Sequence, residues 1–363
     1  SRSDMISLRR LQIEVELLPL LFGDIVVKRL VAIQPDVLLE IDAGGRGNWD
    51  FAGPAAAPAA PAGAEEGGDI ALPDVQDVRV EGGRLVMTDA AEGEVLRLEI
   101  AEAVGTVPAG GGSRSLQLRA AYNGIPFTLD ATYGGLPALL SGRPGPIDLT
   151  LEAGGATITG KGSAGDLTGQ PDADVVLTAQ GDSLAGIAPF LGSELPAFGP
   201  YDLSAKVNAG SEVVEISNLA LKIGTSDLGG NATLKLTGER PALRGQLISK
   251  LLDVADFSGA REEGGAAGGG GDTGGGRVFS EDPLPLDGLR ALDAQVKLGV
   301  DLLRLSPQLE LDDVQLTLAL KGGNLTVEPL NALLAGGKLN GRLALAAAKA
   351  EPDLDFALDG TDI

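Results

Sequence analysis

The sequence predicts an all-β fold, and three observations support this prediction. Short segments that alternate apolar and polar residues recur about every ten residues, and such a period of two gives a strand one apolar and one polar face. The connections are rich in glycine, which accounts for 54 of the 363 residues. Segments with the apolar period of a long helix are almost absent, so strands must supply nearly all of the regular structure.

The predicted strands follow one another along the whole chain. The first lies at Leu11 to Leu17, and the next two, Ile25 to Val31 and Val37 to Ile41, are separated by Gln34-Pro35-Asp36. A glycine pair, Gly82-Gly83, likewise divides Val75 to Val80 from Leu85 to Thr88. Further alternating segments begin near residues 95, 116, 127, 147, 201, 219, 232, 292, 309, 325 and 339. We expect two short helical segments, one at Ser183 to Leu191 with an N-cap at Ser183 or Asp182, and one turn at Asn331 to Ala335.

Part of this pattern is an internal repeat. Asn218 to Phe257 contains alternating strands, a turn near Pro241 and an Asp-containing turn at its end. Gly155 to Ile187 and Gly336 to Ile363 follow the same order, with prolines at 171 and 352. Self-similar segments of this length are typical of a supersecondary unit that buries its apolar face only by stacking on its neighbours.

Two low-complexity spacers divide the chain. Residues 53–69 are rich in proline, alanine and glycine, and residues 259–277 are rich in glycine, so both are predicted to be flexible. The predicted organisation is therefore strands in 1–52, a central repeated β-region in 70–258 and a C-terminal β-region in 278–363, which together form one elongated array. The single tryptophan, Trp49, is expected to fix a turn against a sheet edge.

Composition excludes several classes of function. The chain contains no Cys and no His, so disulfides, thiolate chemistry, most hydrolase triads and most zinc sites are excluded, and no carboxylate pair stands out as catalytic. We therefore expect no enzymatic activity, no metal and no cofactor. The net charge of −23 argues against binding to nucleic acid or to an anionic membrane surface. No apolar run reaches the roughly 20 residues of a membrane-spanning helix, and the beginning of the chain suggests a soluble fragment of a longer protein.

About twenty strands with one aliphatic face must curl, split into two layers or close. If the sheet curls and stays open, a long apolar groove results; if it splits, the same residues fill a sandwich core, and the alternation alone favours the sandwich. The candidate lining residues are aliphatic and share one face of their strands: Leu116, Leu118, Leu129, Leu149, Leu151, Leu203, Val207, Leu221, Leu234, Leu236, Val296, Leu298, Leu316, Leu318, Leu343 and Leu345.

Three passages resemble the AsmA family of Gram-negative envelope proteins. They are Leu20 to Phe51, which ends in Asn48-Trp49 after a glycine-rich turn, Glu194 to Phe257, and Gly322 to Leu345. The resemblance covers most of the chain outside the spacers. It implies a long, strongly curled, mostly antiparallel sheet of repeated strand units with a few short helices, a β-taco-like groove similar to that of bridge-like lipid-transfer proteins, and so favours the groove over the sandwich.

The resemblance also implies a function. We expect a non-enzymatic periplasmic groove that conducts phospholipid or another acyl lipid between the inner and outer membranes and supports outer-membrane biogenesis. The full-length protein would be anchored in the inner membrane by an N-terminal helix absent from this fragment. The alternative is a structural or assembly factor for outer-membrane or other envelope proteins, which would use exposed strand edges and need no lipid conduit.

Overall fold

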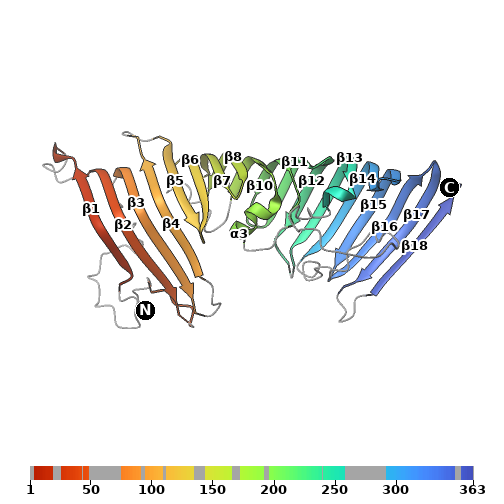
Figure 1. Cartoon of the computed structure of the whole chain (residues 1–363), viewed down its shortest axis with the longest axis horizontal. Coiled ribbons are helices and arrows are strands. Elements are labelled where there is room, and N and C mark those ends of the chain that lie inside the picture. The colour runs from red at the N-terminus through yellow and green to blue at the C-terminus, as the bar shows by residue number, and fades with distance from the viewer. Residues whose placement is uncertain are drawn as a thin grey trace, which may run out of the picture. The chain divides into compact units, whose positions relative to one another are not determined.

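The chain forms one mixed β-sheet of 18 strands, shown in Figure 1. The computed structural model describes residues 4–18, 26–42, 44–48, 75–90, 95–108, 112–134, 144–165, 172–191, 196–238, 240–257, 292–347 and 353–362. The all-β prediction is confirmed, because strands account for almost all regular structure. Trp49 and the two predicted spacers lie outside the described residues, and the predicted domain ranges stay predictions.

Strands within the first of two compact units, Ser1–Lys161, pair in chain order. They are β1 (Ile6–Val15), β2 (Val27–Ile41), β3 (Val75–Asp89), β4 (Val95–Thr106), β5 (Arg114–Tyr122), β6 (Ile125–Tyr133) and β7 (Gly145–Ala153), and β8 (Ala156–Gly165) begins in this unit. The β2–β3 pair is parallel, and the other registered pairs are antiparallel.

The second unit, Gly162–Ile363, also pairs its strands in chain order. It contains β9 (Asp172–Gly181), β10 (Tyr201–Ala209), β11 (Val213–Ile223), β12 (Ser226–Lys235), β13 (Ala242–Asp253), β14 (Asp293–Ser306), β15 (Leu309–Lys321), β16 (Asn324–Leu334), β17 (Gly337–Ala346) and β18 (Asp353–Thr361). Only β13 and β14 pair in parallel among its registered pairs.

The two parallel pairs explain the positions of the low-complexity spacers. Antiparallel neighbours can be joined by a two-residue turn, whereas parallel neighbours need a crossover connection of a dozen residues or more. Residues 53–69 lie between β2 and β3, and residues 259–277 lie between β13 and β14. Each spacer therefore belongs to a connection that parallel pairing requires to be long.

Three predicted interruptions of strands are wrong. Gln34-Pro35-Asp36 does not separate two strands, because β2 continues through Gln34 with a positive φ of 50°. Gly82-Gly83 lies inside β3, and Gly82 adopts a φ of 66° at about the same position along the sheet as Gln34 of the paired strand β2. Residues 331–334 belong to β16 rather than to a helical turn. At Gln34 and Gly82, residues that usually end a strand are accommodated by an irregularity that β2 and β3 share. At residues 331–334, pairing with β17 outweighs the local helix propensity.

The helix predicted at Ser183 to Leu191 is confirmed. It consists of a 3₁₀ turn, η1 (Leu184–Ile187), and the short α-helix α3 (Ala188–Leu191). The hydroxyl of Ser183 accepts a hydrogen bond from the backbone N–H of Ala185 at 3.3 Å, which makes Ser183 the N-cap.

The internal repeat corresponds to a pair of strands followed by a 3₁₀ turn. Gly155 to Ile187 contains β8, β9 and η1, and Asn218 to Phe257 contains the end of β11 followed by β12, β13 and η2 (Val254–Phe257). The third segment contributes β17 and β18. The Asp-containing turns read from the sequence therefore mark the end of the second strand in the first two copies.

Candidate functional site: the apolar face of the sheet

Cross-strand register places the aliphatic residues of the second unit in continuous rows. Directly paired residues of neighbouring strands point to the same side of a sheet, so successive pairs can be followed from strand to strand. The first row is Ala209, Val214, Leu234, Leu243, Ala294, Leu320, Leu325, Leu345 and Leu354. The second is Val207, Ile216, Ala232, Gly245, Val296, Leu318, Val327, Leu343 and Phe356. The third is Leu219, Gly230, Leu247, Leu298, Leu316, Leu330, Gly341 and Leu358.

Bulges keep these rows on one side of the sheet. A bulge inserts one extra residue into a strand and so turns the following side chains to the opposite face of the sheet. The apolar residues stay on one face only if the apolar–polar alternation of the sequence also shifts by one residue at the bulge. Register shifts occur between Ile216 and Leu219 in β11 and between Val327 and Leu330 in β16. In both strands the apolar positions change phase at the shift, and Asn218, inside the first shift, has a φ of 52°. The sequence therefore maintains a single apolar face across two irregularities.

The first unit has a matching apolar face. One of its rows is Leu11, Ala32, Val80, Ala103, Leu118, Leu129 and Leu151, and a second is Ile13, Leu30, Val78, Gly105, Leu116, Ala131 and Leu149. A third, shorter row contains Gly83, Ile100, Ala120, Phe127 and Ala153. We call the rows of each unit its apolar face.

Charged and polar side chains occupy the opposite face of the first unit. Arg29 Nε donates to Asp77 Oδ2 at 3.1 Å, and Arg79 Nη2 donates to Glu102 Oε1 at 3.1 Å. Arg119 also donates to Glu102, and this hydrogen bond lowers the pKa of the Glu102 carboxyl against the opposing effect of desolvation. The two faces of one sheet thus differ sharply in chemistry.

Most side chains of the apolar faces are half-buried rather than buried. Leu118, Leu129, Leu234, Leu318 and Leu343 are all in this class. Four of the buried apolar residues, Val300, Leu311, Val314 and Ala332, form a local cluster in the second unit, with Val314 at 0 % exposure, and Leu320, Ala120 and Ala153 are buried elsewhere on the rows. Away from that cluster, the apolar faces keep accessible hydrocarbon, which is the surface that binds another apolar group.

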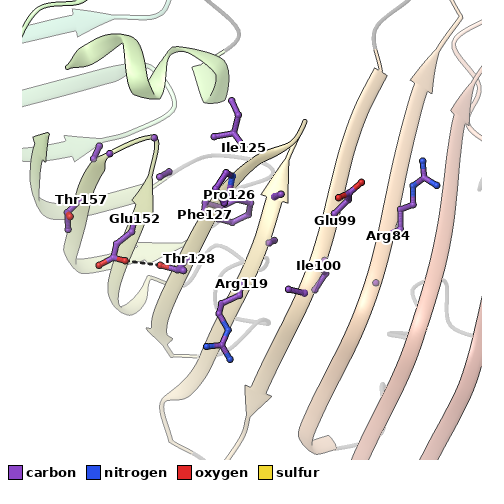
Figure 2. Close-up of a pocket in the computed structure, with 18 of the residues that line it drawn as sticks. Arg84, Glu99, Ile100, Arg119, Ile125, Pro126, Phe127, Thr128, Glu152 and Thr157 are labelled. Atoms are coloured by element: carbon purple, nitrogen blue, oxygen red, sulfur yellow. Dashed lines mark hydrogen bonds between the residues drawn. The ribbon is translucent and has the colours of Figure 1, made fainter. Parts of the chain in front are cut away.

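A hollow of about 1200 Å³ lies in the first unit, and Figure 2 shows side chains around it. Its lining contains the apolar residues Ile100, Ile125 and Phe127 together with the small residues Ala120 and Ala153. Charged residues from β3, β4, β5 and β7 also line it, and among them Glu152 accepts a hydrogen bond from Thr128 at 3.2 Å (Figure 2). A hollow of this size with mixed lining is larger than the sites that hold most small ligands.

The structure places the predicted lining residues in two sets. Leu116, Leu118, Leu129, Leu149 and Leu151 lie on the apolar face of the first unit. Those on the apolar face of the second unit are Val207, Leu234, Val296, Leu298, Leu316, Leu318, Leu343 and Leu345, with Leu203 and Leu221 paired beside them. Leu236 lies one residue beyond the end of β12 and is 44 % exposed, so the ladder does not include it.

Sequence reasoning did not select several residues of the same faces. Leu30, Val78 and Val80 alternate as clearly as the selected leucines, and this alternation was the available signal. Leu247 and Leu330 lie in the third row of the second unit. Leu330 follows a bulge, where simple counting by two places a residue on the wrong face.

The described part of the chain shows neither a metal-binding cluster nor a membrane-spanning helix. No group of three or more His, Cys, Asp or Glu residues there could hold a metal ion. None of the helices described is long and apolar enough to cross a membrane.

The fold and the faces define a class of protein: a many-stranded β-sheet with one apolar and one charged face. The AsmA family profile matches residues 1–188 and 202–359, and the chain belongs to the AsmA family. It is 26 % identical over 252 residues to the "AsmA family protein YhjG" of Escherichia coli (strain K12). This alignment covers 64 % of the chain and 37 % of that relative, so the chain spans well under half the relative's length. No solved structure matches the chain.

Proposed function

We propose that the apolar face of each unit forms a groove that carries acyl lipid in the cell envelope, without enzymatic activity. The observation that carries this proposal is the register of the rows, which keeps one face apolar across nine consecutive strands of the second unit and seven of the first. Membership of the AsmA family supports a role in the envelope. Transfer of phospholipid between inner and outer membranes, the periplasmic location and an inner-membrane anchor in the complete protein are part of the proposal.

The hydrophobic effect would supply the affinity. Each methylene group removed from water contributes about 0.8 kcal/mol, so an acyl chain laid along the rows is held by its length rather than by a specific contact. The rows contain mostly Leu, Val, Ile, Ala and Gly, which offer no directional polar partner. Successive positions along the rows are therefore chemically similar, and a lipid can move between them without leaving apolar surroundings.

The polar face of the second unit supports a groove in which lipid tails lie on the apolar face. In β12 and β15, Thr233 and Thr317 alternate with the apolar Leu234 and Leu318. Thr233 pairs with Arg244, and Thr317 pairs with Lys297, so this side is polar and compatible with water. Lipid tails would lie on the apolar face, while headgroups would remain in water at the opening of the groove.

The experiment is lipid extraction and mass spectrometry of the detergent-free protein, in wild type and two double variants. Leu234→Asp with Leu318→Asp places two charges on the apolar face, and we expect a loss of most co-purifying lipid. Thr233→Asp with Thr317→Asp is the matched control, because it places the same charges one residue away on the polar face. Circular dichroism checks that both variants keep the strand content of wild type.

The outcomes separate the proposal from its alternative. Lipid that is lost only in the apolar-face variant supports the groove. Equal lipid content in both variants, or lipid-free wild type that takes up none from labelled phospholipid vesicles, would overturn it. That second result favours a structural or assembly factor for envelope proteins.

A further inference from the structure

The polar face of the second unit contains a block of residues without a carboxylate, which we call the cationic block. It spans the neighbouring strands β12, β13, β14 and β15 (Figure 1), and cross-strand register places its residues in three rows. The rows are Thr233, Arg244, Gln295 and Ala319; Asn231, Gln246, Lys297 and Thr317; and Gly229, Ile248, Gly299 and Gln315. Arg244 and Lys297 are its only charged residues, although the chain has 51 acidic and 28 basic residues. A positive block on a chain of net charge −23 complements an anionic partner.

Both cations of the block are available to another molecule. Within the described part of the chain, the side chains of Arg244 and Lys297 have no ion pair or hydrogen bond. Asp293 lies diagonally from Arg244, but its Oδ1 already accepts the backbone N–H of Gly322 at 2.9 Å and lies 3.9 Å from Arg240 Nη1. A carboxylate from a partner can therefore approach either cation without displacing an internal one.

A hollow of about 440 Å³ lies between the polar side chains of the block. Those that line it are cationic, amide or hydroxyl side chains: Asn231, Thr233, Arg244, Gln246, Gln295 and Lys297. A side-chain amide offers donors and an acceptor together, as the N–H and C=O groups of a peptide backbone do. Asn231 Oδ1 accepts the backbone N–H of Asn218 at 3.2 Å, which leaves the NH₂ group of Asn231 to donate. This lining suits a peptide, which both donates and accepts, better than a lipid phosphate, which only accepts.

An exposed isoleucine stands beside the hollow. Ile248 is 69 % exposed on this polar face, and its direct cross-strand neighbours are Gly229 and Gly299. Gly299 does not adopt a positive φ, and a Cβ placed there would meet no atom within 4 Å, so neither backbone conformation nor crowding requires a glycine. Glycine inside a strand weakens it and often marks the close approach of a ligand or another chain. The two glycines leave room for a partner's apolar side chain to pack against Ile248.

We propose that the cationic block binds an acidic peptide segment of a partner protein, with carboxylates on Arg244 and Lys297 and an apolar side chain against Ile248. Arg244 and Ile248 are four residues apart on β13, which corresponds to about 13 Å in a strand. An extended peptide along β13 presents alternate residues to the sheet, so the segment would read acid-x-acid-x-apolar. A broad anionic membrane surface fits less well, because it would also approach the acidic surroundings of the block. This interface does not depend on lipid transport and goes beyond the proposed function.

Methyl NMR of the lipid-free protein tests the proposal, because the methyl groups of Ile248 lie inside the block. Ile248→Leu identifies the Ile248 signal. The probe is a peptide with the core Glu-Ser-Glu-Ser-Leu, titrated at about 0.15 M salt, where a Debye length of about 8 Å screens distant acidic side chains. We expect a saturable shift of the Ile248 signal, and none of comparable size with the neutral core Gln-Ser-Gln-Ser-Leu.

Two matched pairs of substitutions locate the binding. Arg244→Gln with Lys297→Gln should weaken peptide binding at least tenfold. Lys206→Gln with Lys222→Gln makes the same change of charge on the same face and should bind like wild type. Its cations already have acidic neighbours, because Lys206 Nζ lies 3.1 Å from Asp174 Oδ1 and Lys222 pairs in register with an aspartate of β12.

A third variant separates this interface from the lipid groove. Thr233→Asp with Thr317→Asp places two carboxylates in the cationic block, so it should lose peptide binding while it keeps the lipid content of wild type. An Ile248 signal that does not move at millimolar peptide, or that moves equally with the neutral peptide, would overturn the proposal. Equal affinity in the Arg244/Lys297 variant and its control would also overturn it. Vesicles of phosphatidylglycerol that shift the signal when the peptide does not would assign the block to a lipid surface instead.

Discussion

The two compact units share the design of an apolar face, but they differ in how much of it is buried. In the first unit, Ala120, Ala153 and Ala156 are the buried apolar residues of the later strands, and the larger aliphatic side chains are half-buried. In the second unit, Val300, Leu311 and Val314 form a buried cluster surrounded by half-buried leucines. A single-layer sheet therefore has a dry core only where its strands bring several large side chains together.

The units also differ in how their carboxylates are used. Glu102 of the first unit binds two arginines on an exposed face. Asp256 of the second unit accepts hydrogen bonds from the backbone N–H groups of Thr225 (3.0 Å) and Ser226 (2.9 Å) and from both hydroxyls. The first arrangement joins side chains, whereas the second holds the β11–β12 turn to η2. Backbone groups are fixed by the fold, so the second arrangement should contribute more to stability.

The buried cluster should give the largest effect. Leu311 is 7 % exposed, so Leu311→Ala removes buried methyl groups and leaves a cavity, and we expect a loss of about 2–4 kcal/mol in the unfolding free energy of the second unit. Hydrogen exchange by mass spectrometry measures this unit by unit. Leu118→Ala in the first unit is the matched control and should cost less, because Leu118 is only half-buried. Equal losses would show that the two apolar faces are buried alike in solution.

The Asp256 turn should give an intermediate effect. Its removal leaves the Thr225 and Ser226 N–H groups without their acceptor, so Asp256→Ala should cost about 1–3 kcal/mol. Burial alone would raise the pKa of Asp256, but the hydrogen bonds from Ser226 and Thr225 outweigh it and lower the pKa below the usual value of an aspartate.

This shift sets the sign of the pH dependence. A carboxyl group whose pKa is lower in the folded state stabilises the protein above its unfolded-state pKa and loses that contribution as pH falls through the folded-state value. Denaturant unfolding should therefore show a difference between wild type and Asp256→Ala that is full at neutral pH and shrinks in strong acid. A difference that does not change with pH would mean that the charge of Asp256 has no part in holding the turn.

The close approach of Asp256 also explains why the β11–β12 turn needs a glycine. Gly224 adopts a φ of 58°, and a Cβ placed there would overlap the Asp256 carboxylate. The sequence shows Gly224 and Asp256 as separate turn signals more than thirty residues apart. Their contact depends on β12 and β13 returning to the same end of the sheet, which local alternation does not specify.

Local alternation nevertheless predicted most of the fold. It identified the all-β class and leucines that lie in common rows, while helix signals placed the short helix and offered Ser183 or Asp182 as its N-cap, of which the structure has Ser183. It failed at Gln34 and Gly82, because residues that usually end a strand can also bend one that continues. It could not assign parallel pairing to β2–β3 and β13–β14, since pairing direction depends on the path of the connecting chain. Nor does it show whether lipid covers the apolar faces, which is a property of binding rather than of strand formation.

The charged face of the first unit should give the smallest effect. Glu102→Gln removes the charge that Arg79 and Arg119 share, but all three side chains are accessible to water, which already solvates them. Exposed ion pairs contribute little because solvent screens them and because ordering long side chains costs entropy. Thermal unfolding of Glu102→Gln should therefore stay close to wild type, and any difference should vanish at high salt. If the loss instead matched that of Asp256→Ala, the ladder of ion pairs, rather than burial and turn contacts, would hold these strands together.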